Sequence, residues 1–310
     1  MALTAGIDEA GRGSLAGPVV SSAVILPESY SLGGLNDSKL LSPKRRLELF
    51  DLIQKQAISI GVGFETESEI DKSNILQATY KSMQRAIGNC KIKPEKALID
   101  GSSLPNQIIP NEGIINGDSF VPSIQAASII AKVTRDNYMI ELDTILPEYG
   151  FKQHKGYGTK LHLEALKEWK SSPVHRKSFS PVKRNLPSIQ WYIKHNKIGW
   201  LGEKLAALHL IKSDCRVVAM NQDCSPYDKI DIIAKKNDTM LFFEVRTSID
   251  SYSTILEDQI DKNEIKQLYD SIQFYIKKYS ISTEVRLDYI LVTLLKGDHK
   301  FNWIKGLSLN

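Results

Sequence analysis

The stretch LTAGIDEAGRGSLAGPVVSSAVIL, residues 3–26, is expected to form the first elements of the first domain. Two apolar runs flank a glycine-rich turn, a pattern that predicts two neighbouring β-strands joined by that turn. Glycines at positions 11, 13 and 17 open backbone conformations that are closed to other residues, and Pro18 stiffens the exit. We therefore expect the first domain to be built on a strand pair.

Acidic residues stand at the ends of several predicted elements in the first half of the chain. Asp8 and Glu9 end the first strand. Asp100 ends the short apolar strand 96–100, and Asp118 precedes a long predicted helix. Carboxylate oxygens are the ligands that Mg²⁺ prefers, and two ions about 4 Å apart can activate a water and stabilise a leaving oxygen. Because aspartate is also a common helix cap and turn residue, the residues alone predict only a candidate metal site.

Asp136 is a further acid that distance excludes from this site. If the long helix begins near Ser123, Asp136 lies about 20 Å along it at 1.5 Å per residue. It could not share a metal with Asp118 at the start of the helix. We expect it to pair with an arginine or a lysine instead.

Helical and strand-like segments alternate along the whole chain, and the pattern starts afresh near residue 189. This predicts two α/β domains, residues 1–188 and residues 189–310. The second is expected to contain a helix, three apolar strands, a further helix and a last strand, at residues 191–213, 215–221, 229–236, 240–247, 263–279 and 285–295.

Composition places the chain among soluble globular proteins, with 310 residues, 42% hydrophobic and 25% charged. No apolar run suits a signal peptide or a membrane span, and the three cysteines form no CxxC motif, so we expect a cytoplasmic location with reduced thiols and no membrane contact. Residues 151–185 carry nine Lys or Arg against two Glu. Such a segment suits phosphate contacts, although a solvated helix face followed by a basic linker would look the same.

Five stretches of the first domain resemble the ribonuclease HII family, in that family's order: GIDEAGRGSLAGPVV, NDSKLLSPKRR, LIDG, GDSFVPSIQAASIIAKVTRD and HKGYGT. The resemblance implies a ribonuclease-H-like mixed sheet flanked by helices. It also implies Mg²⁺- or Mn²⁺-dependent endonucleolysis, with two ions, of RNA in RNA–DNA hybrids and at single ribonucleotides in duplex DNA. Products in that family carry 5′-phosphate and 3′-hydroxyl ends.

The resemblance also implies roles for individual residues. The metal ligands fall on Asp8, Glu9, Asp100 and Asp118. Gly11, Arg12 and Gly13 match a turn whose backbone reads the ribose 2′-hydroxyl, the group that distinguishes RNA from DNA. Tyr157 matches a tyrosine that stacks on the next deoxyribose, and the basic segment is expected to line the duplex path beside it. Phosphate contacts or support for the site are expected from Lys39, Lys132, His154 and Lys155.

The second domain resembles the YraN family, whose fold is that of restriction endonucleases. Matching that fold's nuclease positions are Glu203, Asp231 and Glu244, with Arg246 where a lysine is expected. Arginine is a poor base, and Asp228-Lys229 replaces the Gly-Glu that precedes Ile-Asp in that family. We therefore expect nucleic-acid binding, with an active DNA nuclease and an inert docking domain as alternatives. For the first domain, the alternative to a hybrid-cleaving enzyme is a non-catalytic protein that binds hybrid or duplex.

Overall fold

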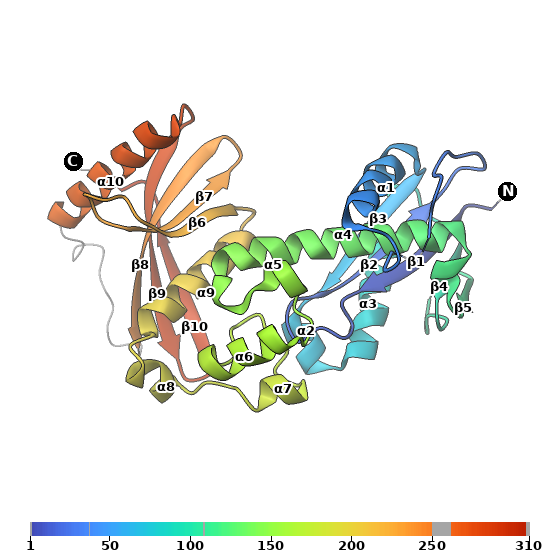
Figure 1. Cartoon of the computed structure of the whole chain (residues 1–310), viewed down its shortest axis with the longest axis horizontal. Helices are drawn as coiled ribbons and strands as arrows, with labels where there is room; N and C mark the ends of the chain where they lie inside the picture. The colour runs from blue at the N-terminus through green and yellow to red at the C-terminus, as the bar shows by residue number, and fades with distance from the viewer. Residues whose placement is uncertain (1, 37, 108, 250–261, 308–310) are drawn as a thin grey trace. The chain divides into compact units, whose positions relative to one another are not determined.

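The computed structural model describes residues 2–36, 38–107, 109–249 and 262–307. The chain divides into two compact units, one of Met1–Ile140 with Glu148–Leu186 and the other of Glu141–Pro147 with Pro187–Asn310 (Figure 1). Each unit contains a five-stranded mixed sheet with its own helices, so the expected α/β fold class is confirmed. The two units are described separately below.

The first sheet has the strand order β3-β2-β1-β4-β5. Its strands are β1 (Thr4–Ala10), β2 (Val19–Ile25), β3 (Ser59–Glu65), β4 (Lys96–Asp100) and β5 (Asn111–Ile114). β1 runs antiparallel to β2 and parallel to β4, with Ile7 opposite Ile99. The predicted strand pair is therefore present, and the central strand β1 ends beside the end of β4.

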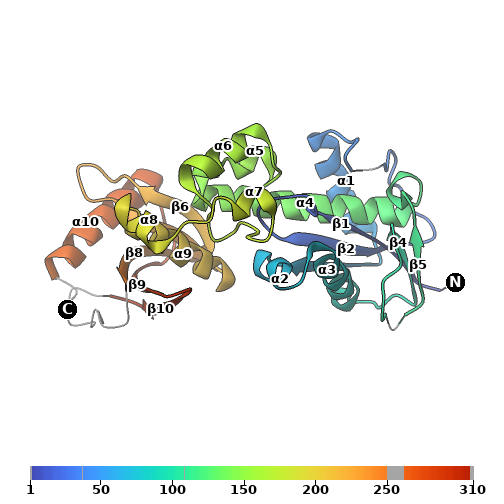
Figure 2. The ribbon, with the colours of Figure 1, turned by 90° about the horizontal axis from the view of Figure 1, so that it is seen from below.

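Helices cover both faces of this sheet, and Figure 2 shows β1 and β2 between α4 and α3. Ala23 and Ile25 of β2 pack on α3 (Ile75–Asn89). Val24, which points the other way because side chains alternate along a strand, packs on α1 (Pro43–Gln56) and α4 (Pro122–Ile145). The remaining helices of this unit are α2 (Glu67–Lys72), η1 (Gly117–Ser119), η2 (Pro147–Tyr149), α5 (Phe151–His154), α6 (Lys160–Trp169) and α7 (Ser180–Lys183).

A glycine in the central strand lets α4 come very close to the sheet. A Cβ atom on Gly6 would lie 2.0 Å from the carbonyl carbon of Ser123. No other residue type fits there without displacing the first turn of α4. Because Asp118 comes just before this turn, the close approach brings it to the end of β1.

The second sheet has the order β10-β9-β8-β7-β6. Its strands are β6 (Arg216–Gln222), β7 (Ile230–Lys236), β8 (Thr239–Ile249), β9 (Val285–Leu295) and β10 (Asp298–Ile304). Phe242, Leu287 and Tyr289 form a core with α10 (Lys262–Tyr279), and α9 (Ile198–Lys212) packs against β8. Within the described part of the chain, no helix is long and apolar enough to cross a membrane.

Two features of the second unit differ from the sequence-based expectation. The helix expected over 191–213 is two helices, α8 (Ile189–Lys194) and α9 (Ile198–Lys212), because Asn196 between them adopts a left-handed backbone with φ 52°. Strand β10 was not expected. Its sequence DHKFNWI is polar and partly exposed at the sheet edge, so it lacks the apolar pattern of the other strands.

Candidate active site

Three carboxylates converge at the end of the central strands of the first sheet. Asp8 lies near the end of β1, Asp100 ends the parallel strand β4, and Asp118 lies in η1. One oxygen from each lies within 4.8 Å of the others, and the backbone N–H of Asp118 donates to Asp100 Oδ1 at 3.3 Å. Among the described residues this is the only group of three acids, histidines or cysteines that comes so close.

Burial makes these acids costly to ionise without a counter-charge. It raises the pKa of Asp8 well above its usual range, and the neighbouring Glu9 adds to this effect. Burial also raises the pKa of Asp100. A divalent cation would offset the mutual repulsion of the three carboxylates. It would also stabilise their charged forms, which burial away from water disfavours. The residues present therefore fit a metal ion.

Glu9 is not one of these three, because side chains alternate along β1 and Glu9 leaves the strand on the face opposite Asp8, but Asp100 and Lys39 are close enough to influence its pKa. Its carboxylate pairs with Arg12, with Nη1 3.3 Å from Oε1. Burial raises the pKa of Glu9, while Arg12 opposes that shift. The structure thus brings three of the four expected acids together and places the fourth beside the glycine-rich turn.

The loop that carries Lys39 contacts the same site. Lys39 Nζ is 3.4 Å from Asp118 Oδ2. The preceding Ser38 hydrogen-bonds through its hydroxyl to Ser128 of α4 at 2.8 Å, and Ser128 in turn hydrogen-bonds to Asp8. The hydroxyl groups of Ser38 and Ser128 therefore connect the loop that carries Lys39 to Asp8.

Two buried arginines hold the turn that follows β1, and the sequence did not single out either for this role. Arg176 donates to the carbonyls of Gly11, Arg12 and Gly17 at 2.7, 2.8 and 3.0 Å. Arg135 donates to those of Ala16, Pro18 and Lys155 at 3.1, 2.9 and 2.9 Å. Together they bind carbonyls on both sides of the turn.

Arg176 differs from most other bases of segment 151–185 because it is buried. Its side chain is fully enclosed, and burial, followed by the nearby Arg135, lowers its pKa to about 9. Arg176 is therefore a positioning residue inside the fold. Six other bases of the segment are exposed: Lys152, Lys160, Lys167, Lys177, Lys183 and Arg184.

Tyr157 lies next to the same turn. It forms an isolated antiparallel bridge with Ser14, and its half-exposed ring has Lys132 Nζ and the Arg135 guanidinium each 5.6 Å from its centre. Lys155 sends its ammonium to the carbonyl of Lys152. The expected substrate residues on the turn and on segment 155–157 are thus adjacent.

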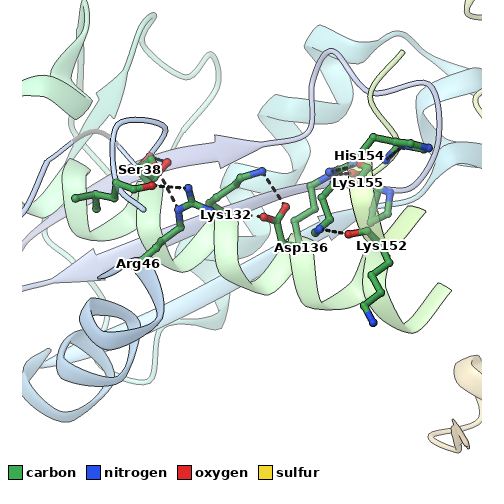
Figure 3. Close-up of polar contacts among 12 residues, drawn as sticks. Ser38, Arg46, Lys132, Asp136, Lys152, His154 and Lys155 are labelled. Carbon is green, nitrogen blue, oxygen red and sulfur yellow. Dashed lines mark hydrogen bonds and ion pairs between the residues drawn. The ribbon is translucent and has the colours of Figure 1, made fainter. Parts of the chain in front are cut away.

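Asp136 connects α1 to α4 through ion pairs with Arg46 and Lys132 (Figure 3). Its carboxylate is 2.9 Å from Lys132 Nζ and 3.8 Å from Arg46 Nη1, as expected for a partner of basic side chains. Arg46 also donates to the carbonyl of Ser38 at 2.9 Å. Asp136 therefore lies between Lys132, whose Nζ is near the Tyr157 ring, and Arg46, which contacts the loop that carries Lys39.

Three histidines pack together beneath Tyr157. His154 and His162 stack with centroids 4.5 Å apart, and His162 Nε2 is 3.0 Å from His175 Nε2. Burial lowers the pKa of His162 to about 4 and that of His175 well below its usual range. The expected site residue His154 bonds the carbonyl of Tyr149 at 2.7 Å. Burial therefore disfavours the charged forms of His162 and His175, and the cluster supports the loop that carries Tyr157.

In the second domain, the four expected residues lie on α9, β7 and β8. Arg246 Nη1 is 2.7 Å from Glu244 Oε1, and Arg246 also pairs with Glu264. Glu203 and Asp231 both face Lys229. Burial, followed by the charge of Asp231, raises the pKa of Glu244 to about 8. The three acids are adjacent, but each forms an ion pair with Lys229 or Arg246.

A mixed sheet with buried acids at the ends of its central strands is typical of ribonuclease-H-like nucleases. The family model described as "Ribonuclease HII" matches residues 5–182, more than half of the chain. The chain belongs to the ribonuclease HII family and is an endoribonuclease that hydrolyses phosphodiesters. A second model, "Uncharacterised protein family UPF0102", matches residues 202–292.

Two relatives similar in sequence agree with this assignment, and one solved structure is similar to the same part of the chain. Ribonuclease HII from two Desulfitobacterium hafniense strains, DCB-2 and Y51, is 54% identical over 185 residues, which are 60% of this chain and 71% of each relative. A crystal structure of ribonuclease H2 from Pyrococcus horikoshii OT3 is 25% identical, with a TM-score of 0.49, over 58% of this chain and 95% of that one.

Proposed function

We propose that the first domain cleaves the RNA strand of RNA–DNA hybrids and cuts 5′ to single ribonucleotides in duplex DNA. It would leave 5′-phosphate and 3′-hydroxyl ends. The convergence of Asp8, Asp100 and Asp118 beside the glycine-rich turn carries this proposal. It puts a site for phosphodiester hydrolysis next to a backbone segment able to approach a ribose closely.

The metal ligands in this proposal are Asp8, Asp100 and Asp118, with Glu9 completing the set at the end of β1. Two Mg²⁺ or Mn²⁺ ions bound there would activate the attacking water and stabilise the leaving oxygen. Lys39, 3.4 Å from Asp118, adds a positive charge where the scissile phosphate would approach. Buried carboxylates with raised pKa values favour this interpretation, because burial without a cation costs free energy.

Recognition of the ribose is assigned to the turn Gly11-Arg12-Gly13. Arg135 and Arg176 bind carbonyls on both sides of this turn, which holds its backbone in one conformation before substrate arrives. A preorganised backbone can bind a 2′-hydroxyl without the loss of conformational entropy that ordering a flexible turn would cost. Tyr157 would offer a ring to the neighbouring deoxyribose, and Lys155 with the exposed bases of segment 151–185 would contact the duplex phosphates.

The test is a duplex DNA that contains one ribonucleotide, with an all-DNA duplex as control. Full-length protein with Mg²⁺ or Mn²⁺ should cut 5′ to the ribonucleotide and leave the all-DNA duplex intact. Losing an outer partner of a metal ligand commonly costs 10- to 100-fold in activity, so Asp8→Asn should lower cleavage by at least about 100-fold. Asp51→Asn, an exposed acid on α1, is the matched control and should cut normally.

Binding without cutting would contradict the proposal. If the protein bound the ribonucleotide-containing duplex but left it intact with either metal, it would be a non-catalytic duplex-binding protein.

For the second domain we propose nucleic-acid binding, in a domain that begins near residue 189. Trp191 stacks on His195 with centroids 4.5 Å apart, and Lys197 Nζ is 5.9 Å from the Trp200 ring. Partly exposed aromatic rings among lysines suit the stacking of bases and the contacts to phosphates that single strands offer.

A further inference from the structure

The acid site of the second domain contains two cations supplied by the chain itself. Lys229, just before β7, places Nζ 3.2 Å from Asp231 Oδ1 and 3.8 Å from Glu203 Oε1. On β8, Arg246 Nη1 is 2.7 Å from Glu244 Oε1. Each of the three acids therefore already faces a positive group.

The other oxygens of two of these acids also have partners. Glu203 Oε2 accepts from the Asn221 side chain at 2.8 Å, and Asp231 Oδ2 accepts from the backbone N–H of Val245 at 3.0 Å. A metal ion would have to displace the lysine to reach an oxygen of each acid. The hydrogen bonds would then hold both carboxylates in place around it.

The first domain provides an internal comparison. There, one oxygen from each of Asp8, Asp100 and Asp118 lies within 4.8 Å of the others, and Lys39 Nζ is 3.4 Å from Asp118 Oδ2. In the described part of the second domain, no three acids converge in this way. The two sites therefore differ in the feature that a divalent cation needs, which is a set of converging oxygens.

Neither base of the second site is suited to accept a proton from water. Arginine stays charged throughout the working pH range. Burial opposes the charge on Lys229, but Asp231 and Glu203 outweigh this, so its pKa is raised. An ammonium held between two carboxylates acts as a counter-ion rather than as a base.

We propose that the Lys229 ammonium takes the place of a divalent cation in the second domain, so that this acid site binds no metal and cuts no nucleic acid. Removing the lysine would leave Glu203 and Asp231 without their counter-charge. Uncompensated buried acids attract cations strongly, so the change should open the site to a divalent ion.

The experiment counts Mn²⁺ ions bound per full-length chain, from the electron paramagnetic resonance signal of free Mn²⁺. Asp100→Asn and Asp118→Asn are introduced first to weaken binding at the first domain. Adding Asp231→Asn to this background should leave the count unchanged. Adding Lys229→Ala instead should raise it by one ion, and combining Lys229→Ala with Asp231→Asn should abolish the gain. Lys235→Ala, an exposed lysine on β7, is the matched control and should add none.

Any of three results would overturn the proposal. The first is a Mn²⁺ ion that binds with Lys229 in place and is lost on Asp231→Asn. The second is metal-dependent cleavage of flapped or single-stranded DNA that is lost on Glu244→Ala. The third is a folded Lys229→Ala protein, judged by circular dichroism, that gains no ion. Lys229→Met keeps most of the side-chain length and replaces alanine if alanine unfolds the domain.

Discussion

Asp8 and Glu9 are neighbours in the sequence, but their side chains leave β1 on opposite faces. Asp8 points toward α4, where Ser128 hydrogen-bonds to it, while Glu9 pairs with Arg12. This follows from the two-residue period of a strand, which continues to Ala10. Two adjacent acids can therefore serve one metal site only from different sides of the strand end.

Gly11 and Gly13 have different structural requirements, although both belong to the same turn. Gly11 has φ +96°, and a Cβ there would lie 1.9 Å from Arg135 Nε. A Cβ on Gly13 would meet no atom within 4 Å. Any other residue at position 11 would be strained and would collide with Arg135, whereas position 13 has open space beside it.

We predict that Gly11→Ala lowers the free energy of unfolding by about 2–6 kcal/mol, since backbone strain and overpacking each cost about 1–3 kcal/mol. Gly13→Ala should stay within about 0.5 kcal/mol of the parent, as typical surface changes do, but should lower cleavage at a single ribonucleotide. Urea unfolding and initial cleavage rates measure the two effects. Normal cleavage by Gly13→Ala would show that the ribose does not approach this glycine.

At the scale of elements, α4 organises the site because residues at different positions along it contact different parts of the first domain. Ser128 bonds Asp8 and the Ser38 loop, Arg135 binds the turn after β1, and Asp136 pairs with Arg46. One rigid helix thus sets the spacing between the metal site and the substrate loops. Its close packing on Gly6 sets its distance from the sheet.

The histidine cluster makes the stability of the Tyr157 region depend on pH. His162 is buried, and its pKa in the folded protein is about 4, below the ordinary 6.5. Below pH 6.5 the unfolded chain therefore binds more protons than the folded one. Stability is present above pH 6.5 and is lost as the pH falls toward 4.

We predict that the free energy of unfolding falls between pH 6.5 and pH 4, with His162 alone contributing about 3 kcal/mol at 1.36 kcal/mol per pKa unit. Urea unfolding at several pH values, followed by a probe in the first domain, measures this. His162→Asn should be less stable at pH 7.5 because it breaks the contact with His175, but its stability should fall less on acidification. An equal fall in parent and variant would exclude His162 as the source.

At the scale of the whole molecule, the chain joins two units that each have a complete sheet and core. The basic segment 151–185 belongs to the first unit, and the surface with Trp191 and Lys197 belongs to the second. If both contact nucleic acid, the second unit would add affinity to an enzyme whose chemistry lies in the first. This division agrees with an acid site that is filled by Lys229.

We predict that Trp191→Ala weakens binding of full-length protein to single-stranded DNA by about fivefold or more, because base–aromatic stacking contributes about 1–3 kcal/mol per base. Fluorescence anisotropy with a labelled oligonucleotide measures the affinity. Tyr227→Ala, an exposed aromatic of the same domain, is the matched control and should bind normally. Unchanged affinity in Trp191→Ala would refute a stacking role, whereas cleavage by the first domain should be unaffected.

Much of the molecule could be predicted from local patterns. The strand pair of residues 3–26, the α/β fold class and the positions of acids at element ends all follow from residues close in the chain. Strand β10 and the break at Asn196 could not be predicted, because a polar edge strand and a left-handed residue within a helical pattern give weak local signals. Both depend on neighbours that the fold supplies.

By itself, the sequence determined the elements, the glycine-rich turn and the resemblance that names the family, because these are properties of short segments. Only the tertiary structure decided that Arg135 and Arg176 turn inward to hold the turn after β1, and that Lys229 lies between Glu203 and Asp231. Arg176 binds a carbonyl 165 residues away. The packing of sheet and helices brings such residues together, and no local pattern records that packing.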